Sequence, residues 1–115
     1  EPPLELKDPV TIDEFAKLDL RVAEVISAEA HPKADRLLVL QLRLGSEERQ
    51  VVSGIREHYT PEELPGKKLV VVANLPPVKL RGIESQGMIL AATDSAGRLS
   101  AVTLDRDLET GSEVT

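Results

Sequence analysis

A leucine at every second position between residues 38 and 44 is the feature that most constrains what this chain can fold into. The positions between the leucines hold Val39, Gln41 and Arg43. Side chains alternate between the two faces of a β-strand, whereas an amphipathic helix repeats its apolar residues about every three to four positions. The pattern therefore predicts a half-buried strand whose leucines face a core.

Further strands follow from β-branched and alternating residues elsewhere in the chain. Residues 20–30 are rich in valine and isoleucine, and their alternation slips near Glu24 and Val25, which predicts a β-bulge. A turn at residues 45–48 returns the chain as an antiparallel hairpin partner over residues 49–54. The remaining predicted strands are residues 67–73, 88–93 and 98–104.

Two capping-box patterns predict short helices. In the first, Thr11 and Glu14 have the threonine-to-glutamate spacing that satisfies free N–H groups at a helix start. It predicts a helix through about Leu18, with Phe15 as its anchor in the core. The second runs from Thr60 to Glu63, with proline at the first helical position, and predicts one helical turn.

This order of elements predicts an all-β fold. Five or more short strands, with a helix between the third and fourth, indicate a five-stranded Greek-key barrel of the OB type with a C-terminal strand extension. An SH3-like barrel and an open sandwich are the alternatives. The 115 residues are enough for one domain, which we place at residues 11–115. Residues 1–10, with three prolines, are expected to form a linker or extended arm.

The composition of the chain indicates the cellular compartment in which the protein works. The chain has no cysteine, so neither disulfides nor thiolate metal sites contribute, and a cytoplasmic location is expected. No apolar run approaches the roughly 20 residues that cross a bilayer, so we expect a soluble protein with no membrane partner. The sequence begins with glutamate and has its one methionine at position 88, which indicates a piece of a longer protein.

Residues 74–88 are the segment most typical of a binding loop. Pro76 and Pro77 end the preceding apolar strand, because proline offers no N–H to a sheet. The segment then carries Lys79 and Arg81 among small residues that let another backbone approach closely. Loops held on a rigid scaffold often carry binding groups, so we expect these cations to be functional.

The charge distribution supports a local polyanion site in an acidic molecule. The formal net charge is −6, yet residues 30–81 hold nine Lys/Arg against six Asp/Glu. Net charge governs solubility and long-range steering, while a local patch decides where a polyanion docks. The alternative is that these cations belong to an ordinary solvated surface mixed with acids.

Catalytic signatures are absent from the sequence. His31 and His58 fall in predicted loops and are interpreted as surface imidazoles, so no metal is expected. The glycines around Ser85 do not have the G-x-S-x-G spacing of an activated serine, and no phosphate-binding glycine motif occurs. We therefore expect no catalysis, no cofactor and no small-molecule substrate.

Several motifs resemble the tRNA-binding OB-fold domain family. They occur in the family's order and spacing from about residue 10 onward, and they are Asp19-Leu-Arg-Val22, His31-Pro-Lys-Ala-Asp-Arg-Leu-Leu38, Val52-Ser-Gly-Ile55, Val72-Ala-Asn-Leu75 and Lys79-Leu-Arg-Gly-Ile-Glu-Ser-Gln-Gly-Met88. The family includes C-terminal appendages of bacterial methionyl-tRNA synthetases, stand-alone dimeric tRNA-binding proteins and a secretion chaperone. The resemblance implies an OB barrel that forms a homodimer and binds tRNA without strong preference among tRNAs.

The resemblance also implies a set of tRNA-binding residues, namely Arg36, Ser53, Asn74, Lys79, Arg81, Ser85 and Met88. Arg36 stands where the family usually has lysine and retains the cation. Lys33 stands where many members carry an acid. For Ser53 and Asn74 the alternative is hydrogen bonding to the barrel's own backbone. For Met88 the alternative is packing.

The scarcity of aromatic residues bears on mechanism. Single-strand binders stack bases on aromatic rings, but this chain has only one phenylalanine and one tyrosine. We therefore expect phosphate and 2′-hydroxyl contacts fitted to the shape of a folded tRNA. The competing function is a protein-binding module of the same fold, either a secretion-type chaperone or a pure dimerization domain.

Overall fold

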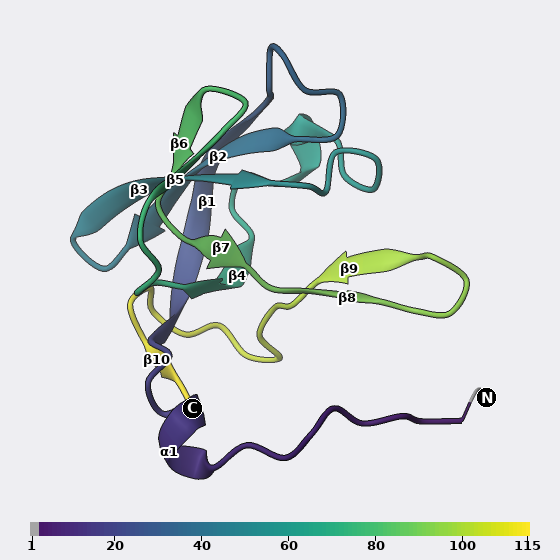
Figure 1. The fold of residues 1–115 in the computed structure, drawn as a ribbon. Coiled ribbons are helices and arrows are strands. Elements are labelled where there is room, and N and C mark those ends of the chain that lie inside the picture. The colour runs from purple at the N-terminus through teal and green to yellow at the C-terminus, as the bar shows by residue number, and fades with distance from the viewer. Residues whose placement is uncertain (1–2) are drawn as a thin grey trace.

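A strongly curled antiparallel sheet forms the centre of the molecule (Figure 1). The computed structural model describes residues 3–115. The sheet has the strand order β3-β2-β1-β4-β7, with β10 paired to the start of β1. These strands are β1 (Leu20–Ala30), β2 (Leu38–Leu44), β3 (Glu47–Ser53), β4 (Lys68–Val72), β7 (Met88–Ile89) and β10 (Glu113–Val114).

Two hairpins and two short helices are attached to this sheet. The hairpins are β5 (Val78–Leu80) with β6 (Ile83–Ser85), and β8 (Ala91–Thr93) with β9 (Leu99–Ala101). The helices are α1 (Ile12–Phe15) and the 3₁₀ turn η1 (Pro61–Glu63). In Figure 1 the hairpin β5–β6 lies at the upper end of the sheet, β8–β9 projects from its side, and α1 lies at the lower end beside the C-terminus.

The long strand β1 curls the sheet by pairing with different neighbours along its length. Its first half, Leu20 to Glu24, pairs with β4, and its second half, Glu24 to Ala30, pairs with β2. The register with β2 shifts between Val25 and Ser27. This shift is the predicted bulge, and a bulge bends and twists the strand that carries it.

The core lies inside the curl and confirms the leucine alternation. All four leucines of β2 are buried, and Arg43 between them is exposed. Val39 is buried as well, although the alternation places it on the other face. Its register partner Val52 donates its N–H to the hydroxyl of Ser85 on β6. The hairpin β5–β6 therefore lies along the free edge of β3, where the Gln86 N–H also donates to the Gln50 carbonyl at 2.8 Å.

The prediction for the first helix was wrong in its length and in its anchor. The capping box is present, with the Glu14 N–H donating to the Thr11 hydroxyl at 3.1 Å. The helix ends at Phe15 rather than near Leu18, and none of its residues is buried. Phe15 is 41% exposed, because a single helical turn at the end of the sheet has no sheet face beneath it in one chain.

The segment 74–88 was expected to be a loop, but it contains the hairpin β5–β6. Leu80 faces Ile83 in the register, so only Arg81 and Gly82 connect the strands. Both have positive φ, 51° and 90°, as the type I′ turn of a two-residue hairpin requires. Arginine is unusual at this turn position, so the sequence does not predict the turn.

The C-terminal strands are shorter than predicted. The predicted strand 88–93 divides at Leu90 into β7 and β8, and the predicted strand 98–104 is reduced to β9. Residues 3–10 are exposed and contain no regular secondary structure. Within the described residues 3–115, no helix is long and apolar enough to cross a membrane.

Candidate nucleic-acid interface

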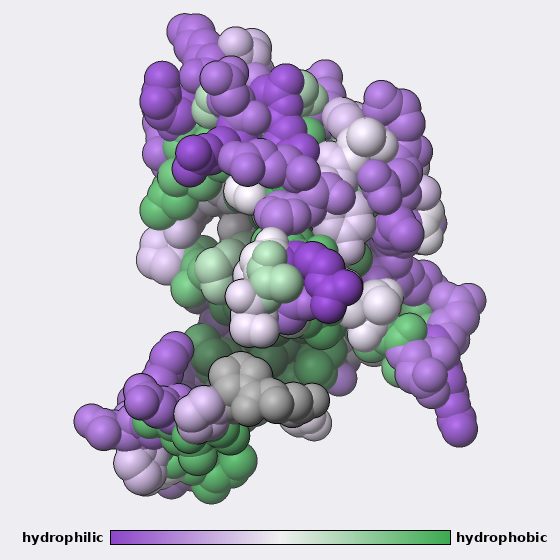
Figure 2. Space-filling view, turned by 90° about the vertical axis from the view of Figure 1, so that its right-hand side faces the viewer, coloured by the Kyte–Doolittle hydropathy of each residue, from purple (hydrophilic) through white to green (hydrophobic). Residues whose placement is uncertain are grey.

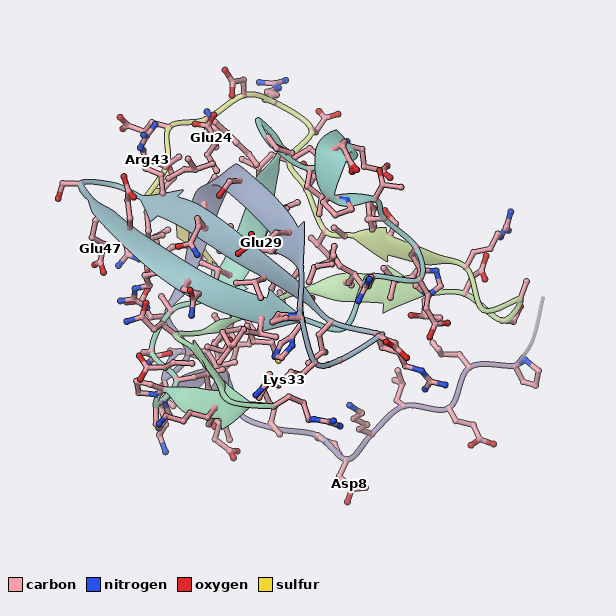
Figure 3. All side chains as sticks on the ribbon, turned by 90° about the horizontal axis from the view of Figure 1, so that it is seen from above. Asp8, Glu24, Glu29, Lys33, Arg43 and Glu47 are labelled. Carbon is pink, nitrogen blue, oxygen red and sulfur yellow. The ribbon has the colours of Figure 1, made fainter. Side chains whose placement is uncertain are left out.

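Three cations from two distant segments line one shallow depression of about 400 Å³. Lys33 and Arg36 come from the loop between β1 and β2, and Arg81 comes from the tip of the hairpin β5–β6. Asp35 is the one acid in the lining, so the depression has a positive balance. Figure 3 shows Lys33 on this loop, apart from Glu24 and Arg43 on the far part of the sheet. We call this depression the basic depression.

Arg81 is held at the hairpin tip in a conformation that arginine rarely adopts. Its φ of 51° places it in the left-handed region, which costs a residue with a Cβ about 1–2 kcal/mol. Asparagine or glycine would fit this turn position better. A strained residue that keeps a charged side chain at a tip often indicates a functional role.

The cations differ in how far neighbouring acids neutralise them. Arg36 pairs with Glu57 at 3.0 Å, but both side chains are more than half exposed, and such pairs are weak and easily exchanged. Within residues 3–115 no salt bridge involves Lys33, Lys79 or Arg81. Lys79 lies opposite Glu84 in the β5–β6 register.

Lys79 lies apart from the basic depression. It alternates along β5 with Val78 and Leu80, which line a separate apolar depression. Because successive side chains of a strand point to opposite faces, Lys79 points away from that apolar surface. The structure thus brings Arg36 and Arg81 together but leaves Lys79 on the other face of the hairpin.

The loop that carries Lys33 and Arg36 is supported from two sides. Arg56 donates a guanidinium N–H to the Ala34 carbonyl at 3.1 Å. On the other side, the His31 ring lies 3.0 Å from the Leu80 carbonyl. His31 is 2% exposed, so its interpretation as a surface imidazole was wrong. Both supports come from residues that the sequence did not indicate as functional.

Ser85 is a buried structural residue at the base of the hairpin. Its hydroxyl accepts the Val52 N–H at 2.9 Å and donates to the Gly87 carbonyl at 2.9 Å. It is 2% exposed, so in this conformation its hydroxyl is not available to an RNA. Next to it, a Cβ on Gly87 would lie 2.9 Å from the Val72 carbonyl oxygen, which explains the need for glycine there.

Asn74 lies at the α1 end of the sheet rather than in the basic depression. Its side-chain carbonyl accepts the Asp19 N–H at 2.9 Å, and its amide donates to the Lys17 carbonyl at 2.7 Å. These bonds agree with the alternative that it stabilises the barrel's own backbone. Ser53 ends β3 opposite Leu38 and is half-buried.

Met88 belongs to an apolar depression of about 300 Å³ beside the hairpin. The side chain is 49% exposed. The depression is lined by Val52, Leu75, Pro76, Val78, Leu80, Ser85, Gly87 and Met88. Met88 is therefore accessible, in contrast to Ser85.

The tyrosine ring is the one large aromatic group near these loops, and its hydroxyl is occupied. The Tyr59 hydroxyl accepts the Ala101 N–H at 3.0 Å, and the ring packs against the core. This leaves guanidinium planes and cations, rather than aromatic rings, as the exposed groups of the basic depression.

Comparison with known proteins identifies the family. A family model described as "Putative tRNA binding domain" matches residues 20–113. The methionine–tRNA ligase of Deinococcus radiodurans is 61% identical over 105 residues, which is 91% of this chain and 15% of the ligase. The chain thus spans only a small part of the length of this relative.

Two solved structures share the whole fold. The MetRS related protein from Pyrococcus horikoshii has a TM-score of 0.85 and 38% identity, and the match covers 97% of this chain and 100% of that one. The chaperone CsaA of Bacillus anthracis has a TM-score of 0.85 and 28% identity, with 94% and 100% covered. The curled antiparallel sheet and these likenesses confirm the predicted OB-type barrel. Because the family model matches residues 20–113 and the Deinococcus ligase is 61% identical over 91% of this chain, the chain belongs to the tRNA-binding domain family.

Proposed function

We propose that this chain is a non-catalytic module that binds folded tRNA through the basic depression. The observation that carries the proposal is the convergence of Lys33, Arg36 and Arg81 from two segments onto one surface. Cations and guanidinium forks recognise phosphate, and such recognition carries no base sequence. The module therefore selects tRNA by shape and backbone, with little preference among tRNAs.

Electrostatics sets the expected strength of this binding. Each phosphate that is neutralised releases counterions, so the affinity falls with salt with a slope of about 0.7 to 0.9 per neutralised phosphate. Because the depression holds only three cations, we expect a modest dependence of affinity on salt and a moderate affinity for tRNA. Lys79, on the opposite face of the hairpin, reaches a phosphate only if the tRNA wraps around the tip.

The proposal is tested by fluorescence-polarization titration of labelled tRNA at several salt concentrations. The double variant Arg36→Ala with Arg81→Ala is expected to bind about 100-fold more weakly, at about tenfold for each charge-assisted hydrogen bond that is removed. A matched control, Arg98→Ala with Arg106→Ala, removes the same charge elsewhere and should bind like the wild type. Equal losses of affinity in both double variants, or no binding by the wild type, would refute the proposal.

We further propose that the module is part of a methionyl-tRNA synthetase and raises the affinity of that enzyme for tRNA. The support is the 61% identity to a methionine–tRNA ligase. Tethering a weak binder to a catalytic body raises the effective concentration of the tRNA without new chemistry. The module by itself should activate no amino acid. Methionine-dependent pyrophosphate exchange by the purified chain would contradict this.

We also propose that the module forms a homodimer through its α1 end. Ile12, Phe15 and Leu18 are exposed apolar residues there, and with Val114 they line a further depression. In Figure 2 the upper part of the viewed face is hydrophilic, whereas hydrophobic residues gather in its lower part. Phe15→Asp should yield a monomer in analytical ultracentrifugation and leave the basic depression intact. A dimer that survives this change would place the interface elsewhere.

One observation favours a protein-binding function as the second candidate. The apolar depression at Val78, Leu80 and Met88 lies open beside the cations, and the chaperone CsaA has the same fold. Met88→Lys should abolish the capture of an unfolded apolar peptide if this function is correct. If the change does not affect peptide binding and the protein binds tRNA, the apolar depression is not a peptide site, and RNA binding remains as the supported function.

A further inference from the structure

Among the described residues 3–115, the buried His31 ring is the one side chain that hydrogen-bonds to both cation-bearing segments. Its Nδ1 accepts the Lys33 N–H at 3.0 Å, and its Nε2 lies 3.0 Å from the Leu80 carbonyl oxygen. A nitrogen that faces an N–H must be unprotonated, and a nitrogen that faces a carbonyl must carry the proton. The ring is therefore the neutral Nε2–H tautomer, and it uses both of its polar atoms.

These two bonds differ in what they hold. The bond from Lys33 is local and shapes the turn after β1. The bond to Leu80 reaches a residue 49 positions away, directly before Arg81 at the hairpin tip. Because β5 and β6 are only three residues each, the hairpin depends on such attachments for its position.

We propose that His31 is a positioning residue that sets the spacing between Arg36 and Arg81 and so fixes the geometry of the phosphate-binding surface. This inference rests on the proposed function and deepens it. A guanidinium pair matches two phosphates of a folded RNA only at a fixed separation. Preorganisation of that separation lowers the entropic cost of binding.

Other attachments of the hairpin act at its base rather than at its tip. Ser85 bonds Val52, and Gln50 donates its side-chain amide to the Glu84 carbonyl at 2.8 Å. They fix β6 against β3 and do not involve the connecting residues Arg81 and Gly82. The His31–Leu80 bond is the attachment next to Arg81, and we expect it to restrict movement of the tip.

Two substitutions separate the two nitrogens of the ring. His31→Asn places a carbonyl oxygen where Nδ1 lies and keeps the turn, but it is too short to reach Leu80. His31→Gln places an amide donor near the Nε2 position and keeps the link to Leu80 without the local acceptor. His58→Asn is the matched control, because His58 is the other histidine and is exposed.

The experiment measures tRNA binding by polarization across salt concentrations, together with thermal unfolding by circular dichroism. His31→Asn should fold and should bind about tenfold more weakly, as expected when one charge-assisted hydrogen bond to phosphate is no longer made. Its salt slope should be smaller by about 0.7 to 0.9 for each phosphate that is no longer neutralised. His31→Gln should stay within about threefold of the wild type, and His58→Asn should be unchanged.

A second measurement reports the spacing without RNA. The chain has no cysteine, so spin labels can be placed at Asp35→Cys in the loop and at Arg81→Cys at the hairpin tip, both exposed positions. Electron–electron resonance should give a narrow distance distribution for the wild type and His31→Gln, and a broad one for His31→Asn. This result would support the inference even if the wild type bound no tRNA, in which case the proposed function alone would fail.

Three results would overturn the inference. The first is a His31→Asn variant with wild-type salt slope and a narrow distance distribution. The second is an equal loss of affinity in the Asn and Gln variants that follows their loss of stability. The third is a His31→Asn variant that does not fold, since the link to Leu80 would then serve the barrel as a whole.

Discussion

The two attached hairpins, β5–β6 and β8–β9, use their polar groups in opposite ways. In β8–β9 the turn is satisfied by its own residues, because Asp94 accepts the N–H groups of Ala96 and Arg98 and pairs with the Arg98 guanidinium at 2.8 Å. In β5–β6 the base is bonded to the barrel through Ser85, while Arg81 at the tip has no ion pair within residues 3–115. The β8–β9 turn pairs its cation within itself, whereas the β5–β6 tip presents a cation that is not paired with an acid within residues 3–115.

Under the proposed function, this difference would separate the groups that stabilise the barrel from those that bind. A charge that pairs within its own turn contributes to local order and is not available to a partner. A charge on a hairpin that is fixed at its base remains available at a defined place. Four substitutions test this contrast, and two of them have a matched control in the other hairpin.

The largest effect is expected for Gly87→Ala, at the base of β5–β6. The new Cβ would meet the Val72 carbonyl oxygen at 2.9 Å, and the residue has a φ of 135°. We expect a loss of about 3 kcal/mol in the free energy of unfolding, from steric overlap and backbone strain together. Urea denaturation measures it. Gly97→Ala in β8–β9, where no atom lies within 4 Å, is the control and should lose only about 1 kcal/mol from its φ of 82°.

The next effect is expected for Ser85→Ala. Loss of the hydroxyl leaves the buried Val52 N–H without its acceptor, which costs about 2 kcal/mol. The counterpart is Ser100→Ala, because Ser100 is exposed and its hydroxyl bonds only the adjacent Ala101 carbonyl. Thermal unfolding should separate the two variants clearly. Equal melting temperatures would mean that the base of β5–β6 is not held by Ser85.

Arg81→Asn should change stability and binding in opposite directions. Asparagine tolerates the left-handed conformation of the turn, so the free energy of unfolding should rise by about 0.5 to 1 kcal/mol. Affinity for tRNA should fall about tenfold, because the cation is removed. Unfolding and polarization titrations on the same sample measure both. A variant that is less stable, or that binds as well as the wild type, would contradict the role given to the tip.

The smallest effect is the acid sensitivity of the β8–β9 turn. Hydrogen bonds from the Arg98 N–H, then the Arg98 side chain and the Ala96 N–H, hold the pKa of Asp94 below its ordinary value of 3.8. A lowered pKa in the folded state gives stability that is fully present above the unfolded value and is lost as the pH falls through the folded one. The protection of the Ala96 and Arg98 amides against exchange, measured relative to an unstructured peptide at the same pH, should therefore fall below about pH 4. Asp94→Asn should remove this dependence, and β5–β6 should show none in the same range.

The sequence predicted those parts of the fold that depend on local patterns. The alternation of residues 38–44, the bulge in β1 and the two capping boxes need only neighbouring residues, and each is present in the structure. The segment that carries Lys79 and Arg81 was predicted to be a loop, whereas the structure forms the hairpin β5–β6 there. The three-residue strands β5 and β6 were missed, because they are too short for a periodic signal and their turn holds an arginine.

The candidate site was harder to predict because its geometry depends on distant partners. The burial of His31 depends on a carbonyl 49 residues away, and that of Ser85 on a strand 33 residues away. Asn74 bonds a segment more than 50 residues earlier in the chain. Polar residues with such partners look in the sequence like residues that bind a ligand. Lys79 likewise lies away from Arg36 because side chains alternate along β5. The sequence did not predict this strand, so it could not predict the position of Lys79.

The hydrogen bond between Tyr59 and β9 provides a built-in spectroscopic probe. The chain contains one tyrosine and no tryptophan, so its ultraviolet emission comes from a single ring. That ring is bonded to the Ala101 N–H and follows the segment in which Arg56 supports the loop of Lys33 and Arg36. Changes in tyrosine emission and lifetime can therefore be assigned to one location, where the segment after Arg56 meets β9, without any label.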